Sequence, residues 1–141
     1  MTPDEIKAIQ ASFAKVAPIS EQAAALFYGR LFEIAPEVKP LFRGDITEQG
    51  RKLMATLAVV VNGLSNLPAI LPAASALAKR HVAYGVKAEH YSPVGAALLW
   101  TLERGLGSDW TPELAAAWGS AYGVLSGYMI GEAYGHSAAA E

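Results

Sequence analysis

The chain contains no cysteine, and this absence excludes several kinds of chemistry at once. Without a thiol there is no disulfide, no thiolate nucleophile and no zinc–thiolate site. Charged residues are also scarce, at 17% of the 141 residues, and the formal net charge is −2 at pH 7. Because a basic surface is what attracts a phosphate backbone, we expect no nucleic-acid partner.

The patterns typical of sheets, nucleotide sites and multidomain chains are missing too. No segment alternates polar and apolar residues as a strand does, and there is no Gly-rich phosphate loop, internal repeat or interdomain linker. The first residues contain no basic segment followed by an apolar run. We therefore expect one domain, no signal peptide and a cytoplasmic protein.

Two long stretches, Leu53–Ala78 and Leu114–Gly131, contain no charged residue. The second has 18 residues, close to the lower bound for a helix that spans a membrane. The first, however, is interrupted by asparagines and prolines, the second carries four glycines, and no Lys/Arg asymmetry flanks either. We therefore expect no membrane span, but helices that are buried on several sides or line an apolar ligand.

Most of the chain shows helical periodicity, divided by caps, prolines and glycines. Thr2-Pro3 and Thr111-Pro112 each combine a capping residue with a proline, and Ser20 is the expected cap of the second helix. The pattern predicts about six long helices, joined by short turns: from Pro3 to before Pro18, from Ser20 to before Pro36, from about Thr47 to a break at 66–68, from about Ile70 to before Gly85, from Tyr91 to about Leu106, and from Pro112 to about Ala133. We predict an all-α fold with a frayed tail at 135–141.

Four glycines recur at every fourth residue of the last predicted helix: Gly119, Gly123, Gly127 and Gly131. Each costs about 1 kcal/mol relative to alanine in a helix interior, so the stripe needs a physical reason. One reason is close approach to another helix in the core, and the other is a dimer seam of the GxxxG kind. We favour the core contact, because such seams operate mainly in lipid.

One histidine closes an otherwise apolar helical face. Residues at helical spacing share that face with His81, while Lys79 and Arg80 lie off it. The apolar members of the face are Ile70, Ala74, Leu77 and Ala78. Such a histidine is either a core imidazole satisfied by hydrogen bonds or a ligand to iron in a buried cofactor, and this stretch alone favours the first.

The other two histidines, His90 beside a helix start and His136 in the tail, are expected at the surface. No two histidines have the spacing of a protein metal cage, and no catalytic triad or carboxylate pair stands out. A single histidine is enough to hold iron only if a porphyrin supplies the other ligands.

Several motifs stand in order along nearly the whole chain: Leu26-Phe27-Tyr28-Gly29-Arg30-Leu31-Phe32, Leu41-Phe42, Gln49 with Leu53, Lys79-Arg80-His81, Tyr91, and the segment from Ala117 to Leu125. In this order they resemble single-domain bacterial haemoglobins and the globin domain of flavohaemoglobins. The resemblance implies a globin domain over residues 1–134, with haem b held between the helix of Gln49 and the helix of His81.

The resemblance also implies roles for individual residues. His81 matches the proximal ligand to iron, while Tyr28, Gln49 and Leu53 match the distal pocket in which dioxygen binds. The side chains expected to contact the haem are Phe42, Leu53, His81, Val86, Tyr91 and Val94. Read without the family, Tyr28 is a core tyrosine and Gln49 an exposed residue of a first helical turn. We also expect the second ring nitrogen of His81 to donate to a backbone carbonyl near Leu77.

The sequence departs from the flavohaemoglobin pattern at one position. Those globins have a glutamate in the last helix that is hydrogen-bonded to the proximal network, and the matching residue here is Ala133. Glu132 is its neighbour, but one residue rotates a helical side chain by about 100°, so Glu132 need not replace it. The departure weakens the case for peroxidase-like activation of oxygen.

The resemblance predicts a haem-b globin that binds dioxygen reversibly, for transport or storage, and that also binds NO and CO. One alternative is an enzyme, a nitric oxide dioxygenase served by a separate reductase. A second alternative, from another class, is a helical interaction module without haem.

Overall fold

The computed structural model describes residues 2–42, 45–83 and 85–134, and in these residues it contains helices and no strand. The α-helices are α1 (Pro3–Val16), α2 (Ser20–Ile34), α3 (Ile46–Gly63), α4 (Leu67–Ala83), α5 (Tyr91–Leu106) and α6 (Pro112–Tyr134). Short 3-10 turns join them: η1 (Ala17–Ile19), η2 (Pro36–Leu41), η3 (Leu64–Asn66), η4 (Ala88–His90) and η5 (Gly107–Asp109). The predicted all-α fold is confirmed. The tail at 135–141, with His136, lies outside the described residues.

Two of the three predicted helix caps are present. The Thr2 hydroxyl accepts a hydrogen bond from the Glu5 amide at 3.1 Å, and the Glu5 carboxylate accepts one from the Thr2 amide at 2.9 Å. At the start of α6 the Thr111 hydroxyl accepts from the Leu114 amide at 3.1 Å. The prediction for Ser20 is wrong, because η1 runs directly into α2 and leaves Ser20 with helical backbone angles. A capping residue needs an extended backbone.

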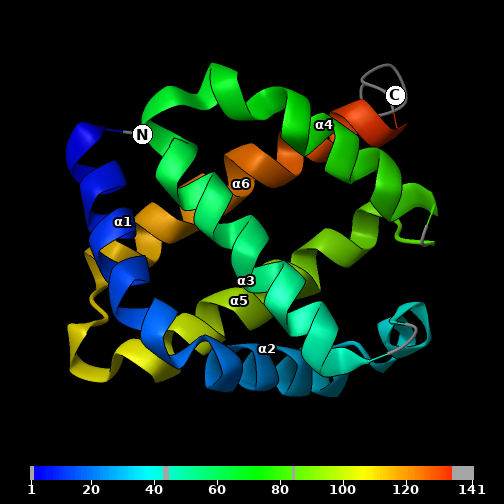
Figure 1. Ribbon diagram of the computed structural model, residues 1–141, viewed down its shortest axis with the longest axis horizontal. Coiled ribbons are helices and arrows are strands. Elements are labelled where there is room, and N and C mark those ends of the chain that lie inside the picture. The colour runs from blue at the N-terminus through cyan, green and yellow to red at the C-terminus, as the bar shows by residue number, and fades with distance from the viewer. Residues whose placement is uncertain (1, 43–44, 84, 135–141) are drawn as a thin grey trace.

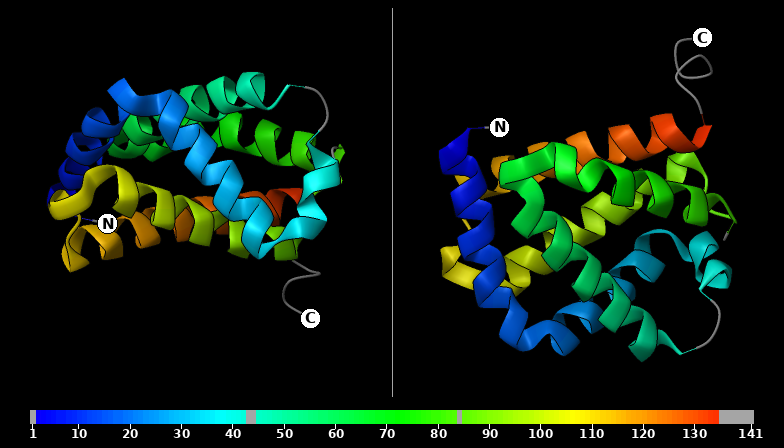
Figure 2. Two further views of the ribbon diagram at one scale, coloured as in Figure 1. Left: turned by 90° about the horizontal axis from the view of Figure 1, so that it is seen from below. Right: turned by 45° about the horizontal axis from the view of Figure 1, so that its top comes forward.

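The helices form two layers that cross at large angles (Figure 1). Seen from below, α3 and α4 lie in one layer and α5 and α6 in the other (Figure 2, left). Helix α2 packs against α3 and α5, whereas α4 packs mainly against α6. The two helices of this layer therefore have different partners, since α3 packs against α2 and also α1, and α4 against α6.

The core consists of two separate clusters of buried side chains. The larger joins α1, α2, α5 and the first half of α6 with η2 and the end of α3, and Ile9, Leu31 and Leu102 are among its most buried members. The smaller contains Ala74, Ala78, Tyr91 and Met129, from α4, α5 and the second half of α6. Helix α3 carries an apolar stripe, yet only Gly50 and Val61 of that helix are fully buried. The protein therefore covers this stripe only in part.

The uncharged stretch from Leu53 to Ala78 does not form one helix. By length and composition, residues Ile46–Val82 are apolar enough to cross a membrane. The chain nevertheless bends at η3 and continues as α4 in another direction (Figure 1). Neither helix alone contributes an uncharged segment of about 20 residues, the length that a span requires.

The glycines of α6 do not lie where the sequence suggested. A Cβ atom built on Gly119, Gly123 or Gly127 would meet no heavy atom within 4 Å, so these three glycines face open space. The predicted close approach in the core is wrong for them. The reason is that α6 is apolar on all sides, so its composition does not mark the side that packs. That side is formed by larger residues, Trp118 and Met129 among them.

Replacing Gly119, Gly123 or Gly127 with alanine should raise the free energy of unfolding by about 0.5–1 kcal/mol each. Alanine restricts the unfolded chain and favours the helix, and here its methyl group meets no neighbour. Urea unfolding followed by far-UV circular dichroism measures the change.

Gly50→Ala is the matched control, with the opposite sign expected. A Cβ atom at Gly50 would lie 2.9 Å from the Cβ atom of Ala24, so α3 would have to move away from α2. Destabilisation by the α6 substitutions would show that the exposed glycine stripe makes a contact after all.

Candidate functional site

Helix α4 carries His81 at the end of its packed face, as the sequence predicted. Ile70, Ala74 and Ala78 are buried at 8%, 5% and 0% exposure. His81 itself is half-buried, and Lys79 and Arg80 just before it are exposed. The apolar face therefore delivers the imidazole to the inside of the molecule while the neighbouring cations stay in solvent.

The backbone of α4 fixes the tautomer of His81. Its Nδ1 atom lies 2.8 Å from the carbonyl oxygen of Leu77, where the sequence predicted a partner. Since a carbonyl oxygen only accepts, Nδ1 carries the proton and Nε2 carries the lone pair. Burial, reinforced by the charge of Arg80 and opposed by the Leu77 bond, lowers the pKa of His81. The imidazole is thus neutral at pH 7, the form that ligates metals.

The end of α4 is built by a glycine turn. Gly85 has a φ of +95°, a value that residues with a Cβ atom rarely adopt. The Gly85 amide donates to the Val82 carbonyl, and the Val86 amide donates to the His81 carbonyl, both at 3.0 Å. This confirms the predicted turn at Gly85, and it brings Val86 back against the smaller cluster.

Tyr91 faces His81 from the start of α5. The two rings are stacked, with centroids 6.3 Å apart and planes inclined at 24°. The backbone of Tyr91 is held by α6, since the Tyr122 hydroxyl donates to the Tyr91 carbonyl at 2.6 Å. A Cβ atom built on Gly95 would lie only 2.6 Å from the Tyr122 ring, so a glycine is needed at this position. Sequence reasoning missed Tyr122 and Gly95, although a glycine inside a helix was a signal for close packing.

Tyr28 lies in α2, on the side of the larger cluster. Its ring is 6% exposed and packs edge-on against Phe42, with centroids 5.2 Å apart. Its hydroxyl has no hydrogen-bond partner among the described residues. Burial raises the pKa of Tyr28 to about 12, so the hydroxyl keeps its proton. A hydroxyl on a buried ring that stays protonated and has no partner in the described part of the protein can donate to a ligand.

Gly50 sets the distance between α3 and Tyr28. Its hypothetical Cβ atom would be 2.9 Å from Ala24 and 3.9 Å from the Tyr28 ring, so only a glycine lets the helices meet here. The neighbouring Gln49 is half-buried, and Leu53 follows one turn later. Neither sequence patterns nor the family resemblance pointed to Gly50.

The predicted site residues therefore divide between the two clusters. Phe42, Leu53 and Val94 pack, partly buried, on the cluster that contains Tyr28. Val86 packs on the cluster that contains Tyr91, the residue stacked on His81. These half-buried apolar side chains are walls that an apolar ring system would cover.

Glu132 does not serve as a partner of the His81 Nδ1 atom, which is occupied by Leu77. Its carboxylate accepts hydrogen bonds from the Ser75 hydroxyl at 2.8 Å and from the Tyr128 hydroxyl at 3.4 Å. Ala133 packs on the smaller cluster without a polar group. The carboxylate that the flavohaemoglobin pattern has beside the histidine is thus replaced here by a bond between α4 and α6.

Among the described residues there is no group of three or more His, Cys, Asp and Glu side chains able to hold a metal ion. His90 is not fully exposed as expected, because its Nδ1 accepts from the Lys87 amide at 3.0 Å. An iron at His81 therefore needs a macrocycle for its other ligands, and the residues present fit a haem: one neutral histidine, apolar walls and a buried hydroxyl donor.

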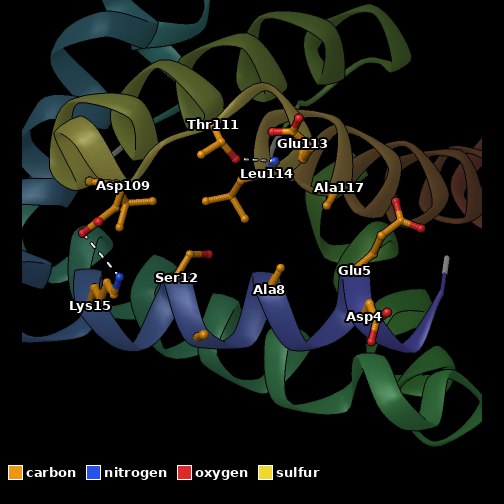
Figure 3. Close-up of a pocket in the computed structure, with 12 residues that line it drawn as sticks. Asp4, Glu5, Ala8, Ser12, Lys15, Asp109, Thr111, Glu113, Leu114 and Ala117 are labelled. Atoms are coloured by element: carbon orange, nitrogen blue, oxygen red, sulfur yellow. Dashed lines mark hydrogen bonds and ion pairs between the residues drawn. The ribbon is translucent and has the colours of Figure 1, made fainter.

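A separate hollow of about 400 Å³ lies between α1 and the start of α6 (Figure 3). Its rim carries Asp4, Glu5, Asp109 and Glu113. Two of these carboxylates already have partners, since Glu5 caps α1 and Asp109 pairs with Lys15 at 3.3 Å. The hollow is at the opposite end of α6 from Met129 and the smaller cluster, so it is not part of the His81 site.

Two comparisons of sequence identify relatives. The family model described as Globin matches residues 25–129. Flavohemoproteins of Bordetella parapertussis and Rhodopirellula baltica are each 34% identical to the chain, over 137 and 119 residues. These matches cover 93% and 82% of this chain, but only 34% and 29% of the flavohemoproteins. The chain thus spans about a third of the length of these curated relatives.

Solved structures match over the full length. A bacterial globin from Campylobacter jejuni has a TM-score of 0.83 and 26% identity, covering 99% of this chain and 100% of that one. An engineered carbene transferase from Rhodothermus marinus, described as a putative nitric oxide dioxygenase, has a TM-score of 0.85 and 28% identity, covering 100% and 99%. With a matching family model, relatives in sequence and this fold, the chain belongs to the globin family.

Proposed function

We propose that this globin binds haem b and holds dioxygen reversibly, with the Tyr28 hydroxyl as the main hydrogen-bond donor. The observation that carries the proposal is Tyr28, whose side chain is 6% exposed among aromatic neighbours and whose hydroxyl makes no hydrogen bond to a described residue. The cytoplasmic location expected from the sequence is part of the same proposal.

When bound, haem would supply an iron able to bind a protein nitrogen and a diatomic gas. His81 supplies the nitrogen through Nε2, because Leu77 holds the proton on Nδ1. Phe42, Leu53 and Val94 would cover the ring system from the larger cluster, and Val86 from the smaller one. Burying their half-exposed surface stabilises the complex by about 25 cal/mol per Å² of apolar area.

Tyr28 distinguishes dioxygen from other gases by charge. A hydroxyl donor in an apolar site would favour a gas that takes up negative charge on binding, as dioxygen does more than CO. With a pKa of about 12, Tyr28 keeps its proton over the whole physiological range. Gln49, half-buried near the start of α3, is suited to a supporting role. NO and CO would bind at the same position.

A second candidate is nitric oxide dioxygenase activity, favoured by the likeness to the Rhodothermus marinus structure described as putatively of that kind. The chain spans about a third of the flavohemoproteins it matches, so electrons would come from a reductase outside these residues. Repeated nitrate formation from NO, with a supplied flavin reductase and NADH, tests this activity. A single turnover without cycling supports oxygen binding alone.

Haem binding itself is tested by the visible spectrum of the purified chain, with and without dithionite, oxygen and CO. A Soret band that shifts with each gas is expected. A chain that stays colourless after incubation with haem would instead favour the helical interaction module.

Tyr28→Phe should accelerate oxygen dissociation about 10- to 100-fold, because a hydrogen bond to a charged partner contributes roughly 1.5–3 kcal/mol. The ring and its contact with Phe42 remain. Gln49→Leu should have a smaller effect. Stopped-flow mixing measures the oxygen and CO dissociation rates of both variants.

Carbon monoxide is the internal control for Tyr28→Phe. Bound CO carries little negative charge, so the CO dissociation rate should barely change. If both gases left faster by the same factor, the substitution would have loosened the pocket. An unchanged oxygen rate would remove Tyr28 from the site.

His81→Gly should abolish the spectrum of the haem protein, and added imidazole should restore it by entering the cavity left by the ring. His90→Gly is the matched control and should leave the spectrum as it is, because its Nδ1 serves the Lys87 amide. A normal spectrum in His81→Gly without imidazole would assign the iron to another residue.

The iron–histidine stretch in resonance Raman spectra should lie in the range of oxygen-binding globins, below that of peroxidases. The Nδ1 partner of His81 is a neutral carbonyl, which gives the ring less imidazolate character than a carboxylate would. Glu132→Gln should leave this frequency unchanged, since that carboxylate binds Ser75 and Tyr128. A high frequency that falls in Glu132→Gln would show that the carboxylate reaches the proximal network.

A further inference from the structure

The exposed side of α3 and α4 has an unusual distribution of charge. It is bounded by Arg51 and Lys52 near the start of α3 and by Lys79 and Arg80 near the end of α4, all four exposed. No charged residue stands between Lys52 and Lys79 in the sequence. We call this surface, from the four cations to the bend between the helices, the α3–α4 face.

The two helices present this face together. Both lie in one layer, on the opposite side of the molecule from α5 and α6 (Figure 2, left). Helix α3 begins and α4 ends on the same side of Figure 1, so the cations stand at the two open ends of a V whose bend is η3. Helical spacing places Ala55, Val59 and Asn62 in line with the cations of α3, and Pro72 and Ala76 in line with those of α4.

The helices that carry the α3–α4 face are positively charged, whereas the rest of the chain is negatively charged. Residues 46–83 contain four of the eleven Lys and Arg residues but only Glu48 among the thirteen acids, which gives them a net charge of +3. The rest of the chain therefore carries −5. Glu48 lies 3.9 Å from Arg51, whose side chain is nevertheless 67% exposed. A protein that is acidic overall thus turns one positive face outward.

The same segment is apolar without being core. Residues Ile46–Val82 have the hydropathy of a membrane span, yet only 17% of the most apolar window is buried inside the protein. On the outer side the exposed residues between the cations are mostly small, and Val59 adds a larger apolar side chain at 58% exposure. A cofactor between the helices would cover their inner sides and leave this outer surface as it is.

We propose that the α3–α4 face docks reversibly on the surface of an anionic lipid bilayer. Cations around an uncharged surface match a layer of anionic headgroups, each Lys or Arg strengthening binding about fivefold. A protein partner is disfavoured, because residues 46–83 contain no Phe, Trp or Tyr, and such aromatic anchors are enriched at protein interfaces. The bend at η3 and the charged ends keep the segment on the membrane surface.

Sedimentation with vesicles tests the proposal on the purified full chain. We expect binding to vesicles of phosphatidylcholine mixed with phosphatidylglycerol at about 0.05 M salt, at least tenfold stronger than to phosphatidylcholine alone. About 0.5 M salt should release the protein, because the Debye length then falls well below 10 Å. Equal binding to both vesicles, or none to either, would overturn the proposal, and the latter would point to an acidic protein as partner.

Two pairs of variants locate the surface. Lys52→Gln with Lys79→Gln should weaken binding about tenfold or more, whereas Lys7→Gln with Lys15→Gln, which removes the same charge from α1, should change it less than twofold. Val59→Glu should abolish binding, while Val124→Glu, at a valine of α6 with 50% exposure, should not. Circular dichroism verifies that each variant is folded. Equal losses in the two members of either pair would place the contact elsewhere.

Discussion

The inner, apolar sides of α3 and α4 are only partly covered by the rest of the protein, and the architecture of the site depends on this. Helices α3 and α4 carry apolar stripes toward the interior, but the buried side chains form two clusters that remain separate. Leu53 and Leu57 of α3 are only half-buried as a result. Apolar surface left half-covered inside a small domain costs free energy that a bound apolar ring would recover. The proposed haem would cover this half-buried apolar surface.

Each cluster supplies one chemical group that an apolar wall cannot. The smaller side contributes a neutral imidazole whose proton is fixed by Leu77, and the larger side contributes the hydroxyl of Tyr28. Both groups sit on helices rather than loops, so their positions follow from packing. Glycines control that packing: Gly50 lets α3 approach Tyr28, and Gly95 makes room for the tyrosine that holds the start of α5. Groups positioned in this way lose little entropy when a ligand binds.

The sequence allowed the helices, the face of His81 and its Leu77 partner to be predicted, because these depend on periodicity and local hydrogen bonds. It did not reveal what each glycine does. Gly50 packs against a neighbouring helix, Gly85 has a positive φ, and Gly123 faces open space. The sequence alone does not distinguish these three glycines. Their roles depend on which helices cross, and crossings are set by long-range packing. The separation of the core into two clusters was hidden for the same reason, as were Gly95 and Tyr122.

Moving the glutamate of α6 by one residue, from position 133 to Glu132, changes which group the carboxylate binds. A glutamate at Ala133 would extend from the side of α6 that packs beside Tyr91, whereas Glu132 is rotated by about 100° and binds Ser75 of α4. Ser75 precedes His81 by six residues, so this bond ties the helix of the histidine to α6. The carboxylate then holds the position of the helix without adding charge to the imidazole. In the function proposed above, a histidine with a neutral partner would favour reversible binding over cleavage of the oxygen bond, and the Tyr28 hydroxyl would help to retain the ligand.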